Sequence, residues 1–123
     1  MGKKTRIKWL DESEEQDYPA AESFLNLIYD ARTAAKYVRQ LRRAAVIEFK
    51  AKDIFRASGL SLLGVSNFHV EKDREKILDG AKLSPILLVR DSRRGRVVVA
   101  DGYHRMCAVY SFDEDAVIPC SIV

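Results

Sequence analysis

The residues best suited to chemistry lie where an apolar run meets a helix-like run, in VVVADGYHR, residues 97–105. The valines predict a buried strand that ends near Asp101, Gly102 permits a tight turn, and Tyr103 begins a helix. A helix N-terminus presents unpaired backbone N–H groups and a partial positive charge, and it therefore binds anions. The pattern predicts a phosphate site at residues 101–105.

Three side chains of this segment carry suitable groups. Arg105 offers a fork of donors for phosphate oxygens. His104 can donate to a phosphate or transfer a proton, because the ordinary pKa of histidine is about 6.5. Asp101 can cap the helix or help to hold a magnesium ion that bridges phosphates. In the alternative, structural interpretation, Asp101 caps the helix, His104 bonds a neighbouring loop and Arg105 forms a salt bridge.

Length and composition indicate one ordinary globular domain of 123 residues with a net charge of +3. This charge permits an anionic partner but is smaller than a nucleic-acid binder usually carries. No apolar stretch reaches the ~18 residues of a membrane span, and no signal-peptide pattern is present. Cys107 and Cys120 are too few for a disulfide framework or a metal set. We expect a cytoplasmic protein that does not bind membranes.

The chain divides into an N-terminal arm, residues 1–17, and one domain, residues 18–123, with a helical lead-in at 18–44 and a core at 45–123. We expect the arm to be mobile or loosely docked, with Trp9 as its anchor. The lead-in predicts one apolar helix face, with a possible break at Asp30. That face consists of Phe24, Leu27, Ile28, Ala31, Ala35 and Val38.

Four cations lie beside this face at steps of four, three and four: Arg32, Lys36, Arg39 and Arg43. Such a stripe could contact the phosphates of a nucleic acid. A solvated helix face that keeps the protein in solution is the more common reason for exposed charge.

The rest of the chain alternates between strand and helix patterns. We expect a strand at 46–49, a short helix at 53–58, a loop at 60–67 and a helix at 69–83. A hairpin follows, with strands at 86–89 and 97–100, then a helix at 103–112 and a strand at 117–123. This order predicts a small α+β domain with a mixed β-sheet and helices at its N-terminal end.

The segment LSPILLVRDSRRGRVVVADGYHRMCAVYSFDEDAVIPCSIV, residues 83–123, resembles the core of the ParB/sulfiredoxin-like superfamily. The likeness covers residues 45–123 well. The segments DYPAAESFL and KAKDIFRASGLSLL extend it to a group of small stand-alone bacterial proteins with a ParB-like nuclease domain. In this superfamily the glycine turn and the helix start hold nucleotide phosphates, so the resemblance implies that fold and ATP or CTP with Mg²⁺ as the ligand.

Two departures narrow the expected activity. Sulfiredoxins carry a reactive cysteine where this chain has Tyr103, and a phenol with a pKa near 10 cannot replace a thiolate. We therefore expect no sulfiredoxin-type reductase activity, and Tyr103 would form a pocket wall or stack on a base. ParB-type partition proteins continue into a helix-turn-helix module, whereas this sequence stops at Val123 on the closing strand. We do not expect this polypeptide alone to bind centromeres.

The sequence Asp-Gly-Tyr-His-Arg, residues 101–105, is closest to the Asp-Gly-His-His-Arg turn of free-serine kinases. That likeness implies an acidic base elsewhere in the domain, and Glu48 and Asp53, near the first strand of the core, are the best-placed carboxylates. They join His104 as the candidate catalytic residues. Their alternative roles are a surface charge and a helix cap. The helix before the hairpin could supply further phosphate contacts through Lys72, Lys76 and His69, although His69 could instead cap that helix.

Three classes of function follow. The first is a nucleotide-dependent phosphotransferase or NTPase, and the second is a nucleotide-sensing module that acts with a protein partner and performs no chemistry. The third is a nucleic-acid-binding accessory protein that uses the basic stripe. Nucleotide turnover would distinguish the first from the second, and steeply salt-dependent binding would indicate the third. The sequence leaves the base of the nucleotide, the acceptor and the oligomeric state open.

Overall fold

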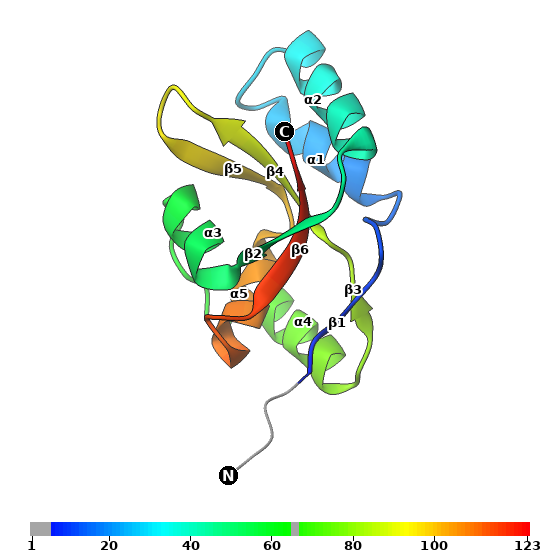
Figure 1. Ribbon diagram of the computed structural model, residues 1–123, viewed down its shortest axis with the longest axis vertical. Coiled ribbons are helices and arrows are strands. Elements are labelled where there is room, and N and C mark those ends of the chain that lie inside the picture. The colour runs from blue at the N-terminus through cyan, green and yellow to red at the C-terminus, as the bar shows by residue number, and fades with distance from the viewer. Residues whose placement is uncertain (1–5, 65–66) are drawn as a thin grey trace.

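The computed structural model describes residues 6–64 and 67–123, and it is an α+β domain (Figure 1). Its elements are β1 (Lys8–Trp9), α1 (Asp17–Leu25), α2 (Ala31–Arg43), β2 (Ile47–Lys50), α3 (Ala51–Ser58), α4 (Phe68–Leu78), β3 (Lys82–Leu83), β4 (Ile86–Asp91), β5 (Arg96–Asp101), α5 (Tyr103–Phe112) and β6 (Val117–Ile122). None of the helices in this described part has both the length and the apolar composition that crossing a membrane requires.

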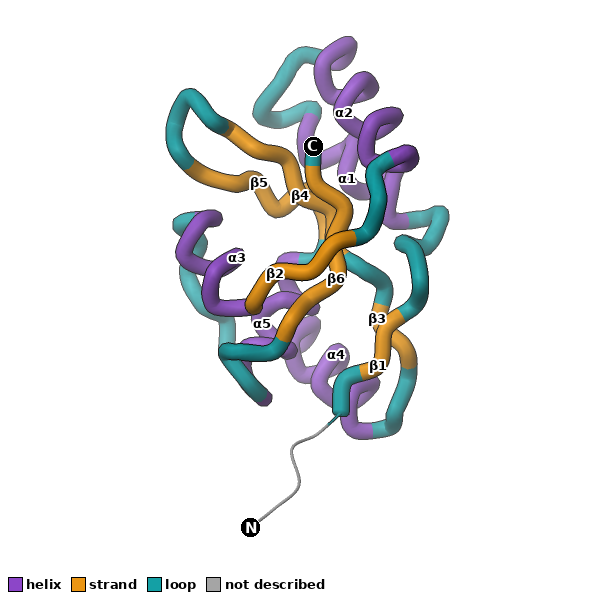
Figure 2. The backbone as a smooth tube through the Cα atoms, viewed as in Figure 1, coloured by secondary structure: helices purple, strands orange, loops and turns teal. Residues whose placement is uncertain are grey.

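The main sheet has four strands in the order β2-β6-β4-β5 (Figure 2). The β4–β5 hairpin and the β2–β6 pair are antiparallel, whereas β4 and β6 run parallel. This arrangement confirms the predicted hairpin and the predicted mixed sheet. A separate two-stranded parallel sheet joins β1 to β3.

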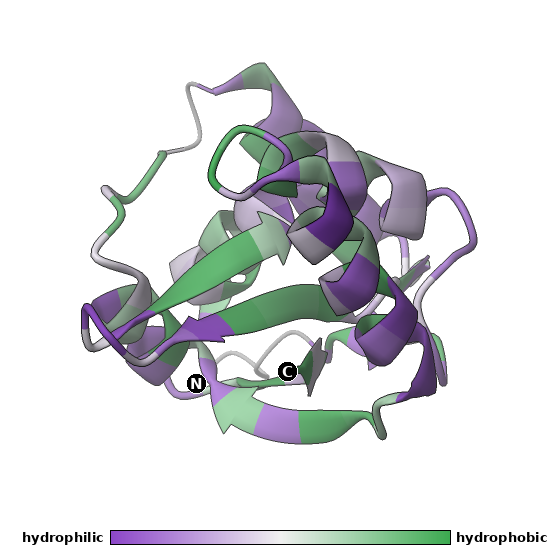
Figure 3. Cartoon of the chain, turned by 90° about the horizontal axis from the view of Figure 1, so that it is seen from above, coloured by the Kyte–Doolittle hydropathy of each residue, from purple (hydrophilic) through white to green (hydrophobic). Residues whose placement is uncertain are grey.

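Strand β4 is buried on both faces and divides the core in two. Ile86 and Leu88 pack with residues of α3, α4 and α5, whereas Leu87 and Val89 pack with residues of α1 and α2. Neighbouring side chains of a strand point to opposite faces, so a strand covered on both sides reads as a continuous apolar run. Figure 3 shows hydrophobic strands in the middle of the domain and largely hydrophilic outer helices.

The lead-in consists of two helices, because the chain breaks at residues 26–30. Asp30 is the N-cap of α2, and its Oδ1 accepts a hydrogen bond from the backbone N–H of Thr33 at 2.8 Å. The break shifts the helical phase, so the single predicted apolar face is wrong in its first half: Phe24, Leu27 and Ile28 are exposed. The buried residues of the two helices are instead Asp17, Tyr18, Ala21, Leu25, Ala34, Val38 and Leu41.

Residues 8–17 are docked on the domain rather than held in a mobile arm. Strand β1 pairs with β3, and Trp9 packs against the core. Farther along, the Ser13 hydroxyl donates to the Pro85 carbonyl at 2.9 Å, and the Glu14 N–H donates to Ser84 Oγ at 3.0 Å. The boundary expected after residue 17 therefore falls inside a packed segment.

Helix α4 ends at Leu78, five residues before the predicted end at residue 83. Gly80 adopts a left-handed conformation with φ of +75° directly after the helix, which ends it as such glycines commonly do. The next residues, Lys82–Leu83, form β3 because β1 supplies a partner strand. Local helical propensity is therefore overridden by a contact from the other end of the chain.

Candidate functional site

A cavity of about 250 Å³ lies between α4 and the N-terminal end of α5. Helix α4 contributes residues at positions i, i+3, i+4 and i+7, a spacing that places side chains on one helix face. The lining consists of His69, Lys72, Asp73 and Lys76 from α4 and Asp101, Gly102, Tyr103, His104 and Arg105 from the β5–α5 turn. Every residue predicted from the sequence as a phosphate or nucleotide contact thus lines one cavity.

Gly102 forms the turn into α5 and allows two neighbours to approach closely. Its φ is +107°, a conformation that other residues rarely adopt. A Cβ atom at this position would lie 2.3 Å from Cγ2 of Ile86 and 3.0 Å from Nη2 of Arg105. Gly102 is also the N-cap of α5, where no side chain among the described residues caps the helix. The first N–H groups of α5 therefore remain available to a ligand.

Arg105 is held by two carboxylates behind the turn. Its Nη2 donates to Asp101 Oδ2 at 2.9 Å and lies 3.8 Å from Asp17 Oδ2. The Ser84 hydroxyl also donates to Asp17 Oδ2. Only 17% of the Arg105 side chain is exposed, so this residue joins the start of α1 to the start of α5. The structure thus has the salt bridge of the alternative interpretation, and Asp101 bonds Arg105 instead of capping α5.

Burial raises the pKa of Asp101 above its ordinary value. The Arg105 guanidinium opposes this shift, whereas the nearby Asp17 carboxylate adds to it. Asp101 and Asp17 share the one guanidinium of Arg105, so the Asp101 carboxylate is ionised only at an energetic cost. Among the described residues, Nε of Arg105 is the one buried side-chain polar atom without a hydrogen-bond partner.

The two histidines of the protein meet across the cavity. The ring centroids of His69 and His104 are 4.8 Å apart with a 45° interplanar angle. Burial lowers the pKa of His104, the neighbouring His69 lowers it further, and Asp73 opposes the shift. The lowered pKa favours the neutral imidazole of His104.

Tyr103 connects the cavity to the loop after α3. Its hydroxyl donates to the carbonyl of Ser61, and its ring lies 5.6 Å from that of His104. Burial raises the pKa of this phenol. These contacts fit the predicted role of a pocket wall, and the raised pKa keeps the hydroxyl protonated.

The lysines supply the mobile positive charge. Lys72 is exposed and forms no ion pair with any residue in the described ranges. Nζ of the exposed Lys76 lies 4.0 Å from Oδ1 of the largely buried Asp73, at the outer limit of an ion pair. Both side chains can reorient toward an anion without breaking a buried interaction.

The two carboxylates predicted as catalytic bases lie elsewhere. Glu48 is on β2 and lines a cavity beside Trp9, whereas Asp53 is on α3 and lines a cavity against the β4–β5 hairpin. Two carboxylates do line the α4–α5 cavity: Asp101, which pairs with Arg105, and Asp73, which no motif in the sequence singles out. Its position four residues after His69 and three before Lys76 is the signal that could have identified it.

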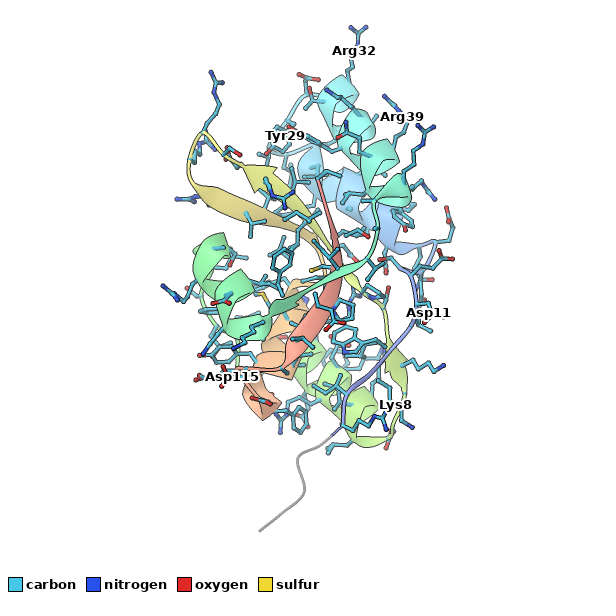
Figure 4. The ribbon with its side chains drawn as sticks, in the orientation of Figure 1. Lys8, Asp11, Tyr29, Arg32, Arg39 and Asp115 are labelled. Carbon is cyan, nitrogen blue, oxygen red and sulfur yellow. The ribbon has the colours of Figure 1, made fainter. Side chains whose placement is uncertain are left out.

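The basic stripe forms an exposed face of α2. Arg32, Lys36, Arg39 and Arg43 are all exposed and form no ion pair within the described residues. Figure 4 shows Arg32 and Arg39 pointing away from the body of the domain. The adjacent Arg42 behaves differently, because it pairs with Glu15 at 2.6 Å and lies over the ring of Tyr18.

Comparison of the chain with protein-family models, curated proteins and solved structures finds no match. The resemblance to the ParB/sulfiredoxin-like superfamily therefore stays a prediction, and the functional argument rests on the cavity itself. Within residues 6–64 and 67–123, no group of three or more His, Cys, Asp or Glu side chains could hold a metal ion.

Proposed function

We propose that the cavity between α4 and α5 binds the phosphate groups of a nucleotide. One observation carries this proposal: two lysines and two histidines line the same cavity as the uncapped N-terminus of α5. Backbone N–H groups at a helix N-terminus donate to phosphate oxygens, and the helix dipole favours their negative charge. The cationic side chains add charge without occupying those donors.

In this proposal each residue has a separate task. The N–H groups of residues 103–105 hold one phosphate, and Lys72 and Lys76 neutralise a second. His104 gains a proton as the phosphate enters, which adds a charged donor. Arg105 takes no part in direct contact because Asp101 and Asp17 already engage it; it keeps the turn in shape.

ATP or CTP with Mg²⁺ is the ligand that the family resemblance favours. The protein is then a phosphotransferase or NTPase, with Asp73, the lining carboxylate that does not pair with Arg105, as its acidic base, or a nucleotide sensor without chemistry. Because phosphoryl transfer needs mainly positioning and charge stabilisation, turnover decides between these two. Mg²⁺ would arrive with the nucleotide, since its phosphates provide most of the oxygen ligands.

The test is thermal unfolding in the presence of ATP, CTP, GTP and their diphosphates, with and without magnesium. A ligand at about a hundred times its dissociation constant stabilises the native state by roughly 2.7 kcal/mol. In a domain of this size, that raises the unfolding midpoint by several degrees. We expect this shift with at least one nucleotide and its loss in Lys72→Gln, whose side chain lines the cavity.

Lys50→Gln is the matched control, because Lys50 is an exposed lysine on β2 outside the cavity. Arg105→Ala is a poor probe of binding, since it leaves two carboxylates without their cation. If a folded protein shows no shift with any nucleotide, or if Lys50→Gln weakens the shift as much as Lys72→Gln does, the cavity is not a phosphate site.

A second candidate function is nucleic-acid binding through α2, favoured by the exposed basic stripe. The probe is a fluorescently labelled DNA duplex titrated by anisotropy at several salt concentrations. Each phosphate that the stripe neutralises would contribute about −0.9 to the slope of log K against log salt. Arg39→Glu would make that slope less steep, whereas Lys72→Gln would leave it unchanged. A slope that Arg39→Glu leaves unchanged contradicts this function.

A further inference from the structure

A second cavity, of about 390 Å³, lies between α3 and the β4–β5 hairpin. Helix α3 lies beside the hairpin, which extends past it (Figure 1). The cavity shares none of its lining residues with the proposed phosphate site. Its volume lies within the range of about 300–1,000 Å³ that small-molecule sites occupy.

The walls of this second cavity are mostly hydrocarbon. In the register of the hairpin, Leu88 pairs with Val99 and Arg90 with Val97. Because strand residues alternate between faces, Leu88, Arg90 and Val97 share the face toward α3. The apolar walls are completed by Phe49, Ile54, Ala57 and Ile122. An accessible hollow lined by apolar side chains keeps hydrocarbon in contact with water, and an apolar ligand would remove that contact.

Two arginines of the hairpin line this cavity, and strand alternation places Arg90 on the face toward α3. Arg90 and Arg96 are both exposed and form no ion pair with any residue of the described ranges. The neighbouring hairpin arginine, Arg94, is instead 3.8 Å from Asp91. Facing the hairpin, Asp53 of α3 lines the same cavity, and its Oδ1 is 4.0 Å from Nη1 of Arg56. The cavity thus has a cation on the hairpin side and a partly neutralised carboxylate on the helix side.

We propose that this cavity binds a small amphipathic acid. Its apolar body, about the size of a single ring or of two fused rings, lies on Leu88, Val97 and Ile122. Its carboxylate or equivalent anionic group pairs with Arg90, for which a planar oxyanion is the best-matched partner. Asp53 disfavours an anion on the opposite side, and it therefore orients the acid with its charged end toward the hairpin.

The inference is tested with two probes of the same shape, 2-naphthoate and its uncharged analogue 2-naphthamide. Each is titrated into the full ¹⁵N-labelled chain, and the backbone amide shifts are followed by NMR. We expect 2-naphthoate to shift amides of α3 and of the β4–β5 hairpin in a saturable way. The amide analogue should bind the same residues several-fold more weakly.

Three variants separate the charge effects from the fold. Arg90→Gln should weaken 2-naphthoate binding roughly fivefold, the scale of an exposed ion pair, and leave 2-naphthamide unchanged. Asp53→Asn should strengthen binding of the acid alone. Arg93→Gln is the matched control, because Arg93 is exposed in the hairpin turn outside the cavity, and it should alter neither probe.

Opposite results overturn the inference. These are equal affinity for the acid and the amide, a naphthoate response that survives Arg90→Gln, and shifts that map outside α3 and the hairpin. The absence of a saturable shift at millimolar probe, in a chain whose spectrum shows the folded state, has the same consequence. A loss of nucleotide binding would leave this second cavity unaffected, so the two proposals fail independently.

Discussion

Replacing Gly102 by alanine adds a single methyl group at the point where β5 turns into α5. Two separate costs follow. The backbone at this position has φ of +107°, and a residue with a Cβ pays about 1–2 kcal/mol in left-handed backbone. The new Cβ would also lie 2.3 Å from Cγ2 and 2.8 Å from Cβ of Ile86.

Ile86 cannot yield easily, because it is fully buried in β4 between its neighbours. Relieving such an overlap requires β4 or the turn at Gly102 to shift, at a cost of about 1–3 kcal/mol. We therefore expect Gly102→Ala to lower the free energy of unfolding by about 2–5 kcal/mol. This loss is a large part of the total free energy of unfolding of a typical native domain, about 5–15 kcal/mol.

Urea unfolding followed by far-UV circular dichroism measures this loss. A double-mutant cycle then separates the overlap from the backbone cost. Ile86→Ala removes Cγ2, the atom nearest to the added methyl, so the double variant Gly102→Ala/Ile86→Ala should lose about 1 kcal/mol less than the sum of the two single changes. Ile86→Val keeps a methyl at that position and should combine additively with Gly102→Ala.

Two results would refute the reasoning. If Gly102→Ala changes the free energy of unfolding by less than about 0.5 kcal/mol, the level of ordinary surface substitutions, the turn does not depend on a missing side chain. If both cycles are additive, the cost lies in the backbone alone and Ile86 is not the neighbour that excludes a Cβ.

Three further predictions concern the groups around the site. Because burial and His69 lower the pKa of His104, the native state binds a proton at this residue less tightly than the unfolded chain does. The free energy of unfolding should therefore fall as pH decreases through about 6.5. Urea titrations at several pH values should show a smaller fall in His104→Gln. Asn67→Ala should cost about 1 kcal/mol in urea unfolding, because the Asn67 side chain accepts from two backbone N–H groups at the start of α4, whereas Asn67→Asp should retain most of the stability. Arg105→Leu should lower the free energy of unfolding by about 3 kcal/mol, since it leaves the carboxylates of Asp17 and Asp101 without their cation. Adding Asp101→Asn should recover part of that loss. An unchanged loss in the double variant would contradict the ion-pair account.

Much of the local structure could be predicted because it depends on neighbours in the chain. The polar turn between two apolar runs predicts the β4–β5 hairpin, and the register confirms it. Gly102 was expected at a turn before a helix, and its positive φ confirms that requirement. The possible break at Asp30 is also present, with Asp30 as an N-cap. Each of these features is decided by residues that are close to it in the sequence.

The errors in prediction have a common origin in distant contacts. The pattern predicts a helix up to residue 83 because nothing nearby shows that Lys82–Leu83 pairs with Lys8–Trp9. The lead-in was assigned one apolar face because periodicity alone does not reveal a change of phase between two helices. The role of Asp17 was missed for the same reason: its partners, Ser84 and Arg105, lie far along the chain.

The sequence by itself determined where a helix would begin with unpaired N–H groups, because a glycine N-cap has no side chain to accept their hydrogen bonds. Only the tertiary structure decided what surrounds that terminus. Packing of α4 against α5 brings His69, Lys72 and Asp73 to the cavity, while β2 and α3 carry Glu48 and Asp53 to other cavities. The physical reason is that backbone geometry is local, whereas the charge and shape of a site depend on which distant segments the core brings together.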